Sequence, residues 1–259
     1  MKNIIIITGA SSGIGEEFAL QMDDYFSNVD EFWLIARRRE KLEELAGCLY
    51  HRTRILAMDI TKDAQLDRLE DTLMEQGGVV RMLVNCAGYG ILGDFASQDR
   101  AKALGMIRTN CQALTELTHR MIPYMRPGSR ILQMASSAAF LPQPDFAVYA
   151  ATKAYVLSFS RALGEELKRA GIYVTSICPG PVDTPFFDIA EQTGASLAVK
   201  KYTMVGPEKV VALALKDSYH KKPVSVCGLP MKALRVLAKL CPHSVLFRAI
   251  DLLKQAENE

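Results

Sequence analysis

The stretch that decides the fold is Ile4–Gly15, which reads I-I-I-I-T-G-A-S-S-G-I-G. Four successive isoleucines favour a buried β-strand, because β-branched side chains fit a pleated surface. Glycines follow at once, and from Gly15 to Phe26 the apolar residues have the spacing of an amphipathic helix. The stretch therefore predicts a strand, a glycine-rich turn and a helix in immediate succession.

The glycines of this turn point to a ligand. Gly9 permits a tight turn, whereas Gly13 and Gly15 let the backbone approach a pyrophosphate and let the helix pack on the sheet. The helix N-terminus offers free N–H groups and the positive end of its dipole to phosphate. The context predicts a dinucleotide site made by Gly9, Ser11, Ser12, Gly13, Ile14 and Gly15. A tight turn that binds nothing is the alternative.

The end of the second expected strand, Glu31–Ala36, indicates which dinucleotide binds. An NAD site has Asp or Glu there to hold the ribose 2′-hydroxyl. This chain has Ala36 at that point, followed by Arg37, Arg38 and Arg39. A guanidinium matches a 2′-phosphate in charge and geometry, so the sequence favours NADP(H) over NAD. The alternative is a solvated basic start to a helix, although basic residues favour the opposite end of a helix.

Apolar, β-branched segments alternate with segments of helical spacing along the chain. The expected strands are Asn3–Thr8, Glu31–Ala36, Arg54–Met58, Arg81–Asn85, Arg130–Ala135, Ile172–Cys178 and Pro223–Val226. The expected helices include Gly15–Phe26, Arg39–Leu49, Thr61–Gln76, Asp99–Met125 and Tyr149–Ala170. Strands apolar on both faces indicate a parallel sheet covered by helices on both sides. We predict a single-domain α/β fold with a doubly wound parallel sheet, whose ligands bind beyond the carboxyl ends of the strands.

Composition and charge exclude several classes of protein. The 259 residues carry a net charge of +2, which gives no reason to expect a nucleic-acid partner. The six cysteines show no C-x-x-C spacing, so we expect neither a metal site nor a redox dithiol. No stretch approaches the ~18 apolar residues that a membrane span needs, and the N-terminal isoleucines are too few for a signal peptide. We expect a cytoplasmic protein.

Tyr149 and Lys153 lie four residues apart on an expected helix, so their side chains share one face. An ammonium near a phenol favours the phenolate and lowers the pKa of the tyrosine. Tyr149 could then give a proton to a carbonyl oxygen or take one from an alcohol. Thirteen residues upstream, Ser136 follows an expected strand and could hydrogen-bond the substrate oxygen. The neighbouring serines, Ser136 and Ser137, could equally just turn the chain.

Together these motifs resemble the short-chain dehydrogenase/reductase family. In order they are TGASSGIG, NCAG (Asn85–Gly88), Asn110, Ser136, Y-A-A-T-K and C-P-G-P-V-D-T (Cys178–Thr184), and the resemblance runs from residue 3 to about residue 226. It implies a Rossmann fold with strand order 3-2-1-4-5-6-7 and a nicotinamide cofactor. The sequence departs from the family at Cys86, often a second Asn, and at Thr152, commonly a Ser.

The resemblance also implies roles for individual residues. Tyr149 is similar to the catalytic acid/base, and Lys153 to the lysine that binds the nicotinamide ribose and lowers the pKa of the tyrosine. Ser136 is similar to the serine that orients the carbonyl, with Ser137 as the alternative; the thirteen-residue offset to Tyr149 favours Ser136. Asn110 resembles the residue that positions a water between the lysine and solvent.

The cofactor residues implied by the resemblance come from five segments. Arg37 and Arg38 match the pair that holds the 2′-phosphate in NADP-dependent members, and Asp59, beside Ile60, resembles the acid that contacts the adenine amine. The remaining matches are Asn85, Ala87 and Gly88 along the adenosine ribose, Tyr149 and Lys153 at the nicotinamide ribose, and Pro179, Gly180, Val182 and Thr184 at the carboxamide and pyrophosphate.

The end of the chain leaves the family pattern. We divide it into a catalytic and NADP-binding domain, 1–228, and an amphipathic helical extension, 229–259. In the extension Lys232, Arg235 and Lys239 share a face opposite Leu234, Leu237 and Cys241. Such a helix usually packs on its own domain or on a partner subunit, and contact with an anionic membrane surface is the lesser alternative.

The sequence favours an NADP(H)-dependent oxidoreductase that interconverts a carbonyl and an alcohol, with Tyr149 as acid/base. Phe186 and Phe187 lie where the family has its substrate lid, which suggests an apolar ketone, 3-oxoacyl or steroid-like substrate. The family also commonly forms homodimers or homotetramers through its long helices. A non-catalytic NADP-binding sensor or scaffold is the alternative, although a mere binder has no need of the Tyr149–Lys153 pair.

Overall fold

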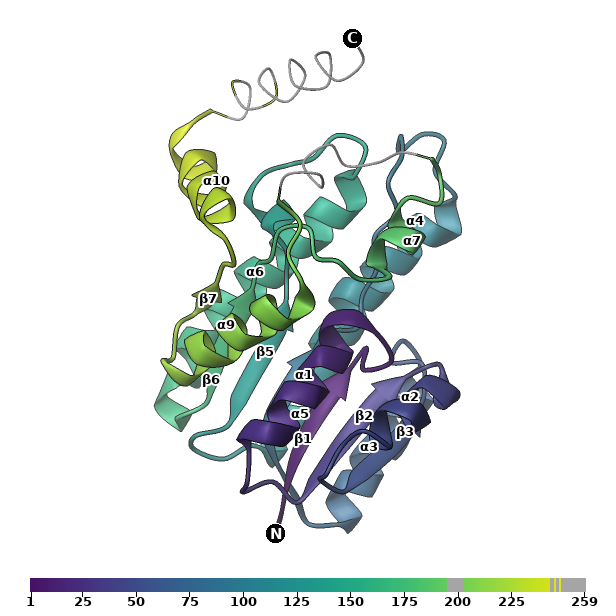
Figure 1. The fold of residues 1–259 in the computed structure, drawn as a ribbon, viewed down its shortest axis with the longest axis vertical. Helices are drawn as coiled ribbons and strands as arrows, with labels where there is room; N and C mark the ends of the chain where they lie inside the picture. The colour runs from purple at the N-terminus through teal and green to yellow at the C-terminus, as the bar shows by residue number, and fades with distance from the viewer. Residues whose placement is uncertain (195–202, 243–244, 246, 248–259) are drawn as a thin grey trace.

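Seven parallel strands form one sheet in the computed structural model, which describes residues 1–194, 203–242, 245 and 247 (Figure 1). The strands are β1 (Lys2–Thr8), β2 (Glu31–Ala36), β3 (Thr53–Ala57), β4 (Gly78–Asn85), β5 (Arg130–Met134), β6 (Tyr173–Ile177) and β7 (Val224–Ser225). Their order is β3-β2-β1-β4-β5-β6-β7. The sheet confirms the predicted doubly wound α/β fold and its strand order.

Helices connect the strands and cover both faces of the sheet. They are α1 (Gly13–Tyr25), α2 (Arg39–Ala46), α3 (Asp63–Glu75), α4 (Arg100–Ile107), α5 (Leu114–Met121), α6 (Ala147–Leu167), α7 (Phe186–Ala190), α9 (Pro207–Tyr219) and α10 (Leu229–Leu240). Short helical turns are η1 (Arg108–Ala113), η2 (Ile122–Tyr124), η3 (Ser137–Phe140) and η4 (Lys168–Ala170).

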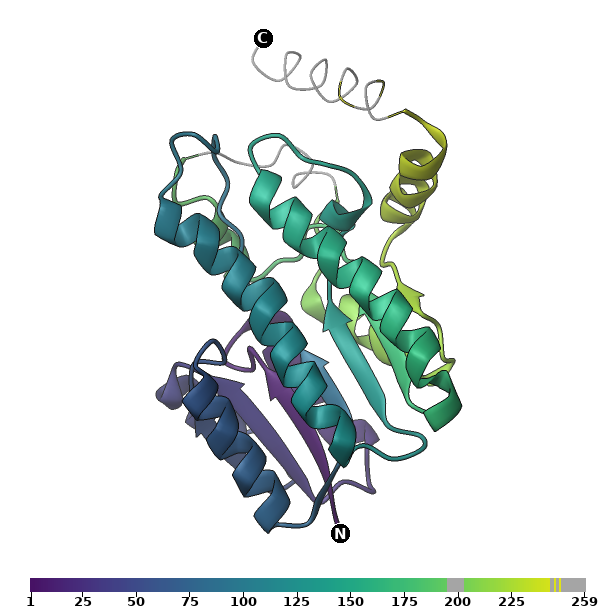
Figure 2. The same ribbon diagram turned by 180° about the vertical axis from the view of Figure 1, so that it is seen from behind.

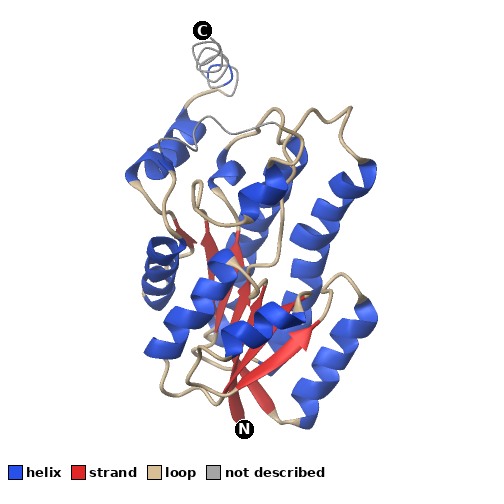
Figure 3. Ribbon diagram, turned by 45° about the vertical axis from the view of Figure 1, so that its right-hand side comes forward, coloured by secondary structure: helices blue, strands red, loops and turns tan. Residues whose placement is uncertain are grey.

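Each face of the sheet has its own core because successive side chains of a strand point to opposite sides. Ile5 and Ile7 of β1 are fully or almost fully buried in a cluster with α1, α2 and α9. Ile4 and Ile6 are fully buried on the other side, in a cluster with α3, α5 and α6. Figures 1 and 2 show these two helical layers from the front and from behind, and Figure 3 shows the strands between them.

The expected helix Asp99–Met125 is interrupted. The chain forms α4, a π-helical turn at η1, α5 and then a 3₁₀ turn at η2. Asp99 caps α4, since its carboxylate accepts a hydrogen bond from the Lys102 N–H at 2.9 Å. The π turn contains Asn110, and such turns often mark functional positions within helices. Apolar spacing alone did not predict this interruption.

Helix α10 stands at one end of the molecule, beyond η3 and β7 (Figure 1). Met231 is buried, and Leu234 packs with it against a cluster that includes Val224 and Val226. Leu237 faces solvent with 48% of its area exposed, so the packed face of α10 is narrower than the sequence predicted. Beyond residue 242 only Val245 and Phe247 of the expected extension 229–259 are among the described residues, and the boundary at 228/229 stays a prediction.

Among the described residues, the helices are all too short or too polar to cross a membrane.

Candidate active site

The sequence-predicted site residues follow the carboxyl ends of neighbouring strands. In the strand register Thr8 lies opposite Asn85, and Met134 lies opposite Ile177. Because the strands are parallel, the loops after β1, β4, β5 and β6 leave the same edge of the sheet. This edge is therefore where the glycine loop, the NCAG segment, Ser136 and the Cys178–Thr184 segment meet.

The glycine loop between β1 and α1 has no space for a Cβ at its three glycines. Gly9 has a φ of 69°, and a Cβ there would lie 2.8 Å from the Ala87 nitrogen. Gly13 has a φ of 60°, and a Cβ there would lie 3.0 Å from Thr184 Cγ2. A Cβ on Gly15 would collide with the Gly9 carbonyl oxygen. The loop thus packs too closely against its neighbours for other side chains.

The first turn of α1 is available to an anion. Ser12 is its N-cap but makes no side-chain capping hydrogen bond. The first amides of a helix lack intrahelical acceptors and attract phosphate when no side chain caps them. Ile14, next in the loop, packs against the core cluster under α1. The close backbone and the uncapped amides fit the pyrophosphate of a dinucleotide.

Arg38 reaches back across the glycine loop. Its Nη2 donates to Ser12 Oγ at 2.8 Å, to Ser11 Oγ at 2.9 Å and to the Ser11 carbonyl at 3.2 Å. Arg37 is exposed beside it, and its positive charge helps to lower the pKa of Asp59. At the end of β2, Arg38 therefore contacts the glycine loop, and Arg37 acts on the charge of Asp59 after β3.

Asp59 and Ile60 follow β3 and have different surroundings. Burial raises the pKa of Asp59, but hydrogen bonds from the Thr61 N–H and hydroxyl outweigh it and lower the pKa overall. Asp59 therefore stays ionised and fixed in orientation. Ile60 is only 7% exposed and packs in the core cluster beneath α3.

One end of the NCAG segment after β4 packs into the sheet, and the other end adjoins the site. The Asn85 amide donates to Thr118 Oγ1 and Gln133 Oε1, both at 3.0 Å, so this side chain points into the buried sheet network. The Ala87 N–H donates to Thr8 Oγ1 at 3.1 Å. A Cβ on Gly88 would lie 2.8 Å from Asn110 Oδ1 and 3.5 Å from Lys153 Nζ. Gly88 is thus the member of the segment that adjoins the predicted catalytic residues.

The segment after β6 closes the other side of the site. The Pro179 carbonyl accepts a hydrogen bond from the Ser137 N–H at 2.8 Å. Val182 pairs with Val205 in a short β-bridge, while Thr184 adjoins Gly13. Gly180 packs against Met231 of α10. The segment therefore connects the glycine loop, η3 and α10.

Helix α6 brings Tyr149 and Lys153 to this edge, where both are buried, with 7% and 4% of their area exposed. Lys153 Nζ lies 5.5 Å from the centre of the Tyr149 ring and donates to the Met134 carbonyl at 2.7 Å. The Ser136 side chain lies beside the Tyr149 phenol and acts to lower its pKa. The structure thus brings Ser136, Tyr149 and Lys153 together at the end of β5.

The two adjacent serines differ in their contacts. Ser136 is the N-cap of η3, and its hydroxyl accepts a hydrogen bond from the Ala138 N–H at 3.1 Å. Its side chain also meets the phenol of Tyr149. Ser137 is buried at 9% exposed, and its N–H is bonded to the Pro179 carbonyl. The described contact to Tyr149 is made by Ser136.

Burial dominates the titration of the pair. It raises the pKa of Tyr149 strongly, and the hydrogen bond from Ser136 opposes only part of that rise. Burial also lowers the pKa of Lys153 from 10.5 to about 8. The sequence led us to expect that Lys153 lowers the pKa of Tyr149. In this structure burial raises that pKa instead, and Lys153 is not among the groups that lower it. The phenol is protonated at neutral pH.

Asn110, in the π turn, holds the loop that follows Gly88. Its Nδ2 donates to the Tyr89 carbonyl at 2.9 Å and to Thr152 Oγ1 at 3.1 Å. Its Oδ1 accepts from the Tyr89 N–H at 3.1 Å. Both backbone groups of Tyr89 are thus fixed by one side chain. Asn110 is brought to the site, and its role toward water stays a prediction.

An aromatic cluster surrounds the phenol. The ring of Phe146 stacks on Tyr149 with centroids 4.2 Å apart, and Phe186 lies 5.5 Å from Tyr149 on another side. Phe187 is buried in the same cluster with Ile91. The sequence singled out Phe186 and Phe187 but missed Phe146 and Tyr89, although Phe146 lies only three residues before the motif tyrosine. The cluster makes this side of the site apolar.

The comparisons with known proteins agree with this geometry. Residues 3–194 match the short chain dehydrogenase family. Sulfoacetaldehyde reductase 2 from Chromohalobacter salexigens is 34% identical over 195 residues, covering 72% of this chain and 75% of that protein. The uncharacterized oxidoreductase YbbO from Escherichia coli (strain K12) is 29% identical and covers 97% of this chain and 95% of its own length.

A solved structure extends the likeness to the whole fold. The short-chain dehydrogenase from Sphingobium yanoikuyae in complex with NADPH superposes with a TM-score of 0.78 at 27% identity, covering 98% of this chain and 94% of that one. The family match spans most of the chain and includes the glycine loop, Ser136, Tyr149 and Lys153. The chain therefore belongs to the short-chain dehydrogenase/reductase family and is an oxidoreductase that uses a nicotinamide cofactor.

Proposed function

We propose that this protein is an NADP(H)-dependent oxidoreductase that reduces a carbonyl to an alcohol, or the reverse, with Tyr149 as the acid/base. The observation that carries the proposal is the placement of the buried Tyr149 phenol beside the Ser136 side chain and 5.5 Å, measured to the ring centre, from the Nζ of the buried Lys153. A hydroxyl that can orient an oxygen and a hydroxyl that can protonate it are thus adjacent. Such a pair suits proton transfer to an oxygen that gains charge during reaction.

A nicotinamide held by the Pro179–Thr184 segment and Lys153 would supply the hydride for reduction of the substrate carbon, or take it up in the reverse direction. Ser136 hydrogen-bonds the substrate oxygen and holds it next to the phenol of Tyr149. As charge develops on that oxygen, Tyr149 gives up its proton to it, which completes the alcohol. Lys153, whose pKa is about 8, carries a positive charge at neutral pH and stabilises the phenolate that remains. A phenol that burial keeps protonated is ready to donate, which favours reduction.

The preference for NADP(H) is supported by Arg38 and Arg37. Arg38 already lies over the hydroxyls of Ser11 and Ser12, and Arg37 is exposed at the same strand end. Guanidinium groups bind phosphate in bidentate geometry, whereas an NAD site needs a carboxylate at Ala36. A similar short-chain dehydrogenase binds NADPH.

The remaining cofactor contacts belong to the same proposal. The glycine loop would hold the pyrophosphate, Asp59 the adenine, Gly88 and Ala87 the adenosine ribose, and the Pro179–Thr184 segment the nicotinamide end. Asn85 and Ile60 would contribute through the packing of the sheet rather than by their side chains, since both are buried within it.

The substrate we propose is an apolar ketone, such as a 3-oxoacyl or steroid-like compound. Phe146, Phe186 and Phe187 surround Tyr149 with aromatic area on the side away from Ser136 and Lys153, and Ile91 and Leu92 add aliphatic area to the same cluster. Apolar pockets with a few placed polar groups are typical of small-molecule sites. Here the placed groups are Ser136 and Tyr149.

We also propose that the protein forms a homo-oligomer and that it acts in the cytoplasm. Leu104 and Ile107 of α4 and Tyr155 of α6 are exposed at 37%, 46% and 43% on the outer helical layer. Tyr155 also bonds the Thr115 hydroxyl at 2.8 Å, so α5 and α6 present one continuous face. Light scattering after gel filtration would distinguish a dimer or tetramer from a monomer.

The proposed mechanism is tested by Tyr149→Phe, which removes the hydroxyl and keeps the ring. We expect NADPH-dependent turnover of a ketone panel to fall by about 10³-fold, in the range for general acid–base catalysis. NADPH binding, followed by fluorescence, should survive. The matched control is Tyr155→Phe, which removes a phenolic hydroxyl on the same helix outside the site. Full activity of Tyr149→Phe would contradict the mechanism.

A further inference from the structure

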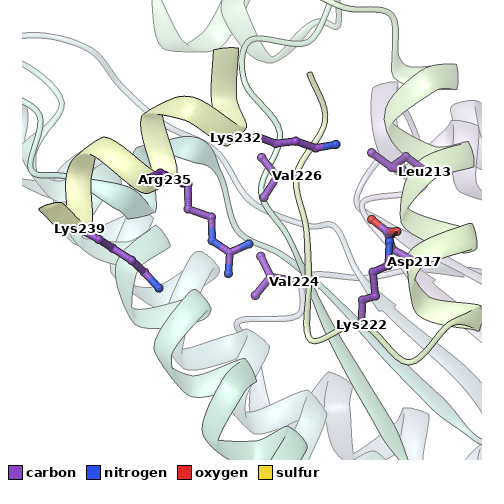
Figure 4. Close-up of a pocket in the computed structure, with 9 residues that line it drawn as sticks. Leu213, Asp217, Lys222, Val224, Val226, Lys232, Arg235 and Lys239 are labelled. Atoms are coloured by element: carbon purple, nitrogen blue, oxygen red, sulfur yellow. Dashed lines mark hydrogen bonds and ion pairs between the residues drawn. The ribbon is translucent and has the colours of Figure 1, made fainter. Parts of the chain in front are cut away.

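A groove of about 390 Å³ lies between α9, β7 and α10 (Figure 4). We call it the α10 groove, and its lining side chains are those of Leu213, Lys222, Val224, Val226, Arg235 and their neighbours. Its volume is within the range of ligand-binding clefts, about 300–1,000 Å³. None of the residues proposed for catalysis or cofactor binding lines it, so it is separate from the candidate active site.

One wall of the α10 groove is strongly basic. Lys232, Arg235 and Lys239 all project into it from α10, because residues three and four apart share a helix face. Like charges at this spacing destabilise a helix unless something compensates them. No ion pair joins these three residues to any residue that the structure describes. The wall therefore lacks an anionic partner within the described part of the chain.

The opposite wall already has its charges balanced. Among the described lining residues Asp217 is the only acid, and its carboxylate is paired with Lys222 Nζ at 2.7 Å. Asp217 is buried, and Figure 4 shows it turned toward Lys222, across the groove from α10. It is consequently unable to neutralise the cations of α10.

The floor of the groove is apolar. Val224 and Val226 of the β7 segment are buried at 9% and 5% exposed, and Val236 of α10 lines the same space with 55% of its area exposed. Arg235 extends from α10 toward Val224 (Figure 4). Arg235 is half-buried and also lies beside Phe140 and Leu157, so its guanidinium is turned toward the domain.

We propose that the α10 groove binds a single-chain anionic amphiphile. Its carboxylate or phosphate head would lie among Lys232, Arg235 and Lys239, and its aliphatic chain would lie along Val236 and Leu213, the lining apolar side chains that still have accessible area. The three cations of the α10 wall favour an anion, and this accessible apolar area favours an apolar tail over a bare ion. Half-buried Arg235 lies inside the groove, which favours a molecule that enters it over a flat surface.

A ligand in the α10 groove would act on residues that pack next to the candidate active site. Met231, one residue before Lys232, packs against Gly180 of the segment that closes the candidate site. Leu234 packs with it into the adjoining core cluster. A ligand that fixes α10 would therefore also fix the surroundings of Gly180. The proposal itself concerns binding and does not depend on turnover.

The test is a calorimetric titration of the full chain with dodecyl phosphate as monomer. We expect one equivalent to bind, and Arg235→Gln and Lys239→Gln each to weaken binding about tenfold, the effect of losing one charge-assisted hydrogen bond. Val236→Gln should weaken it through the tail. The matched control is Lys216→Gln, an exposed lysine of α9 outside the groove, which should bind as the wild type does.

Binding of other ligands shows whether both the head and the tail of the amphiphile are recognised. Dodecanol and inorganic phosphate should each bind at least tenfold more weakly than dodecyl phosphate. Equal binding of dodecanol, of inorganic phosphate or of the Arg235→Gln variant would overturn the proposal, provided that thermal melts show folded variants. Charge-dependent flotation with anionic phospholipid vesicles without binding of the monomer would also overturn it, in favour of a membrane-docking face.

Discussion

Lys153→Met tests the electrostatics of the candidate site in the absence of any ligand. The side chain of Lys153 is 4% exposed, and burial lowers its pKa from 10.5 to about 8. Methionine has a similar length and no charge. The variant should therefore remove the cost of holding a buried ammonium, while it also leaves the Met134 carbonyl without its donor at 2.7 Å. The second effect does not depend on pH, so the two can be separated.

The sign of the pH dependence follows from the direction of the pKa shift. The folded-state pKa of Lys153 lies below that of the unfolded chain, so the unfolded chain binds more protons between about pH 8 and 10.5. The contribution of Lys153 to the free energy of unfolding should therefore rise with pH through this window, and comparison with the variant isolates it from the buried cysteines, whose raised pKa values act in the opposite direction. A lowering from 10.5 to about 8 corresponds to a cost of about 3 kcal/mol at pH 7. At pH 9.5 roughly 1 kcal/mol of that cost remains.

Urea unfolding of the wild type and Lys153→Met at pH 7 and pH 9.5 measures this effect. The difference in unfolding free energy between the two proteins should change by about 2 kcal/mol in favour of the wild type. Lys216→Met is the control, because it removes an exposed lysine and should follow the wild type at both pH values. A difference between wild type and Lys153→Met that stays constant with pH would refute the buried-cation argument.

Other predictions address the cofactor, the glycine loop and the serine. Arg38→Ala should raise the KM for NADPH at least tenfold and that for NADH much less, in steady-state assays, because it removes a guanidinium from the 2′-phosphate side. Gly13→Ala should lower the free energy of unfolding by about 1–2 kcal/mol, since φ there is 60°, whereas Gly47→Ala, at φ −68°, should be neutral or slightly stabilising in the same urea titrations. Ser136→Ala should lower kcat about 100-fold, as the loss of one oxyanion donor does, and Ser137→Ala should leave kcat within a few-fold.

Most of the fold could be predicted because its strands are short, apolar and β-branched. The Ile4–Thr8 run and the glycines after it indicate a strand, a turn and a helix, and the structure has β1 and α1 there. The strand order, by contrast, came from the family resemblance, since pairing between distant strands leaves no periodic signal in one sequence. The doubly wound sheet and its order were both confirmed.

The parts that could not be predicted depend on contacts between distant residues. The π turn at Asn110 is stabilised by hydrogen bonds to Tyr89 and Thr152, which lie 21 and 42 residues away. Helical spacing from Asp99 to Met125 carries no trace of these bonds. Phe146 was missed for a local reason: α6 begins at Ala147, before the expected start of the helix, and the ring that precedes it stacks on Tyr149.

The arrangement of Tyr149 and Lys153 shows why a motif alone leaves the chemistry incomplete. Four-residue spacing places both side chains on one face of α6, and the structure has them there. Proximity alone suggests a phenol made acidic by its neighbour, yet Lys153 Nζ bonds the Met134 carbonyl and Ser136, rather than Lys153, is the side chain that acts to lower the pKa of the phenol. Burial then raises the pKa of Tyr149 and lowers that of Lys153 to about 8, so at neutral pH the phenol is uncharged while the lysine still carries most of its positive charge. The chain by itself therefore keeps the proton on the phenol, as a proton donor requires, and the lysine charge matters most once that proton has been transferred.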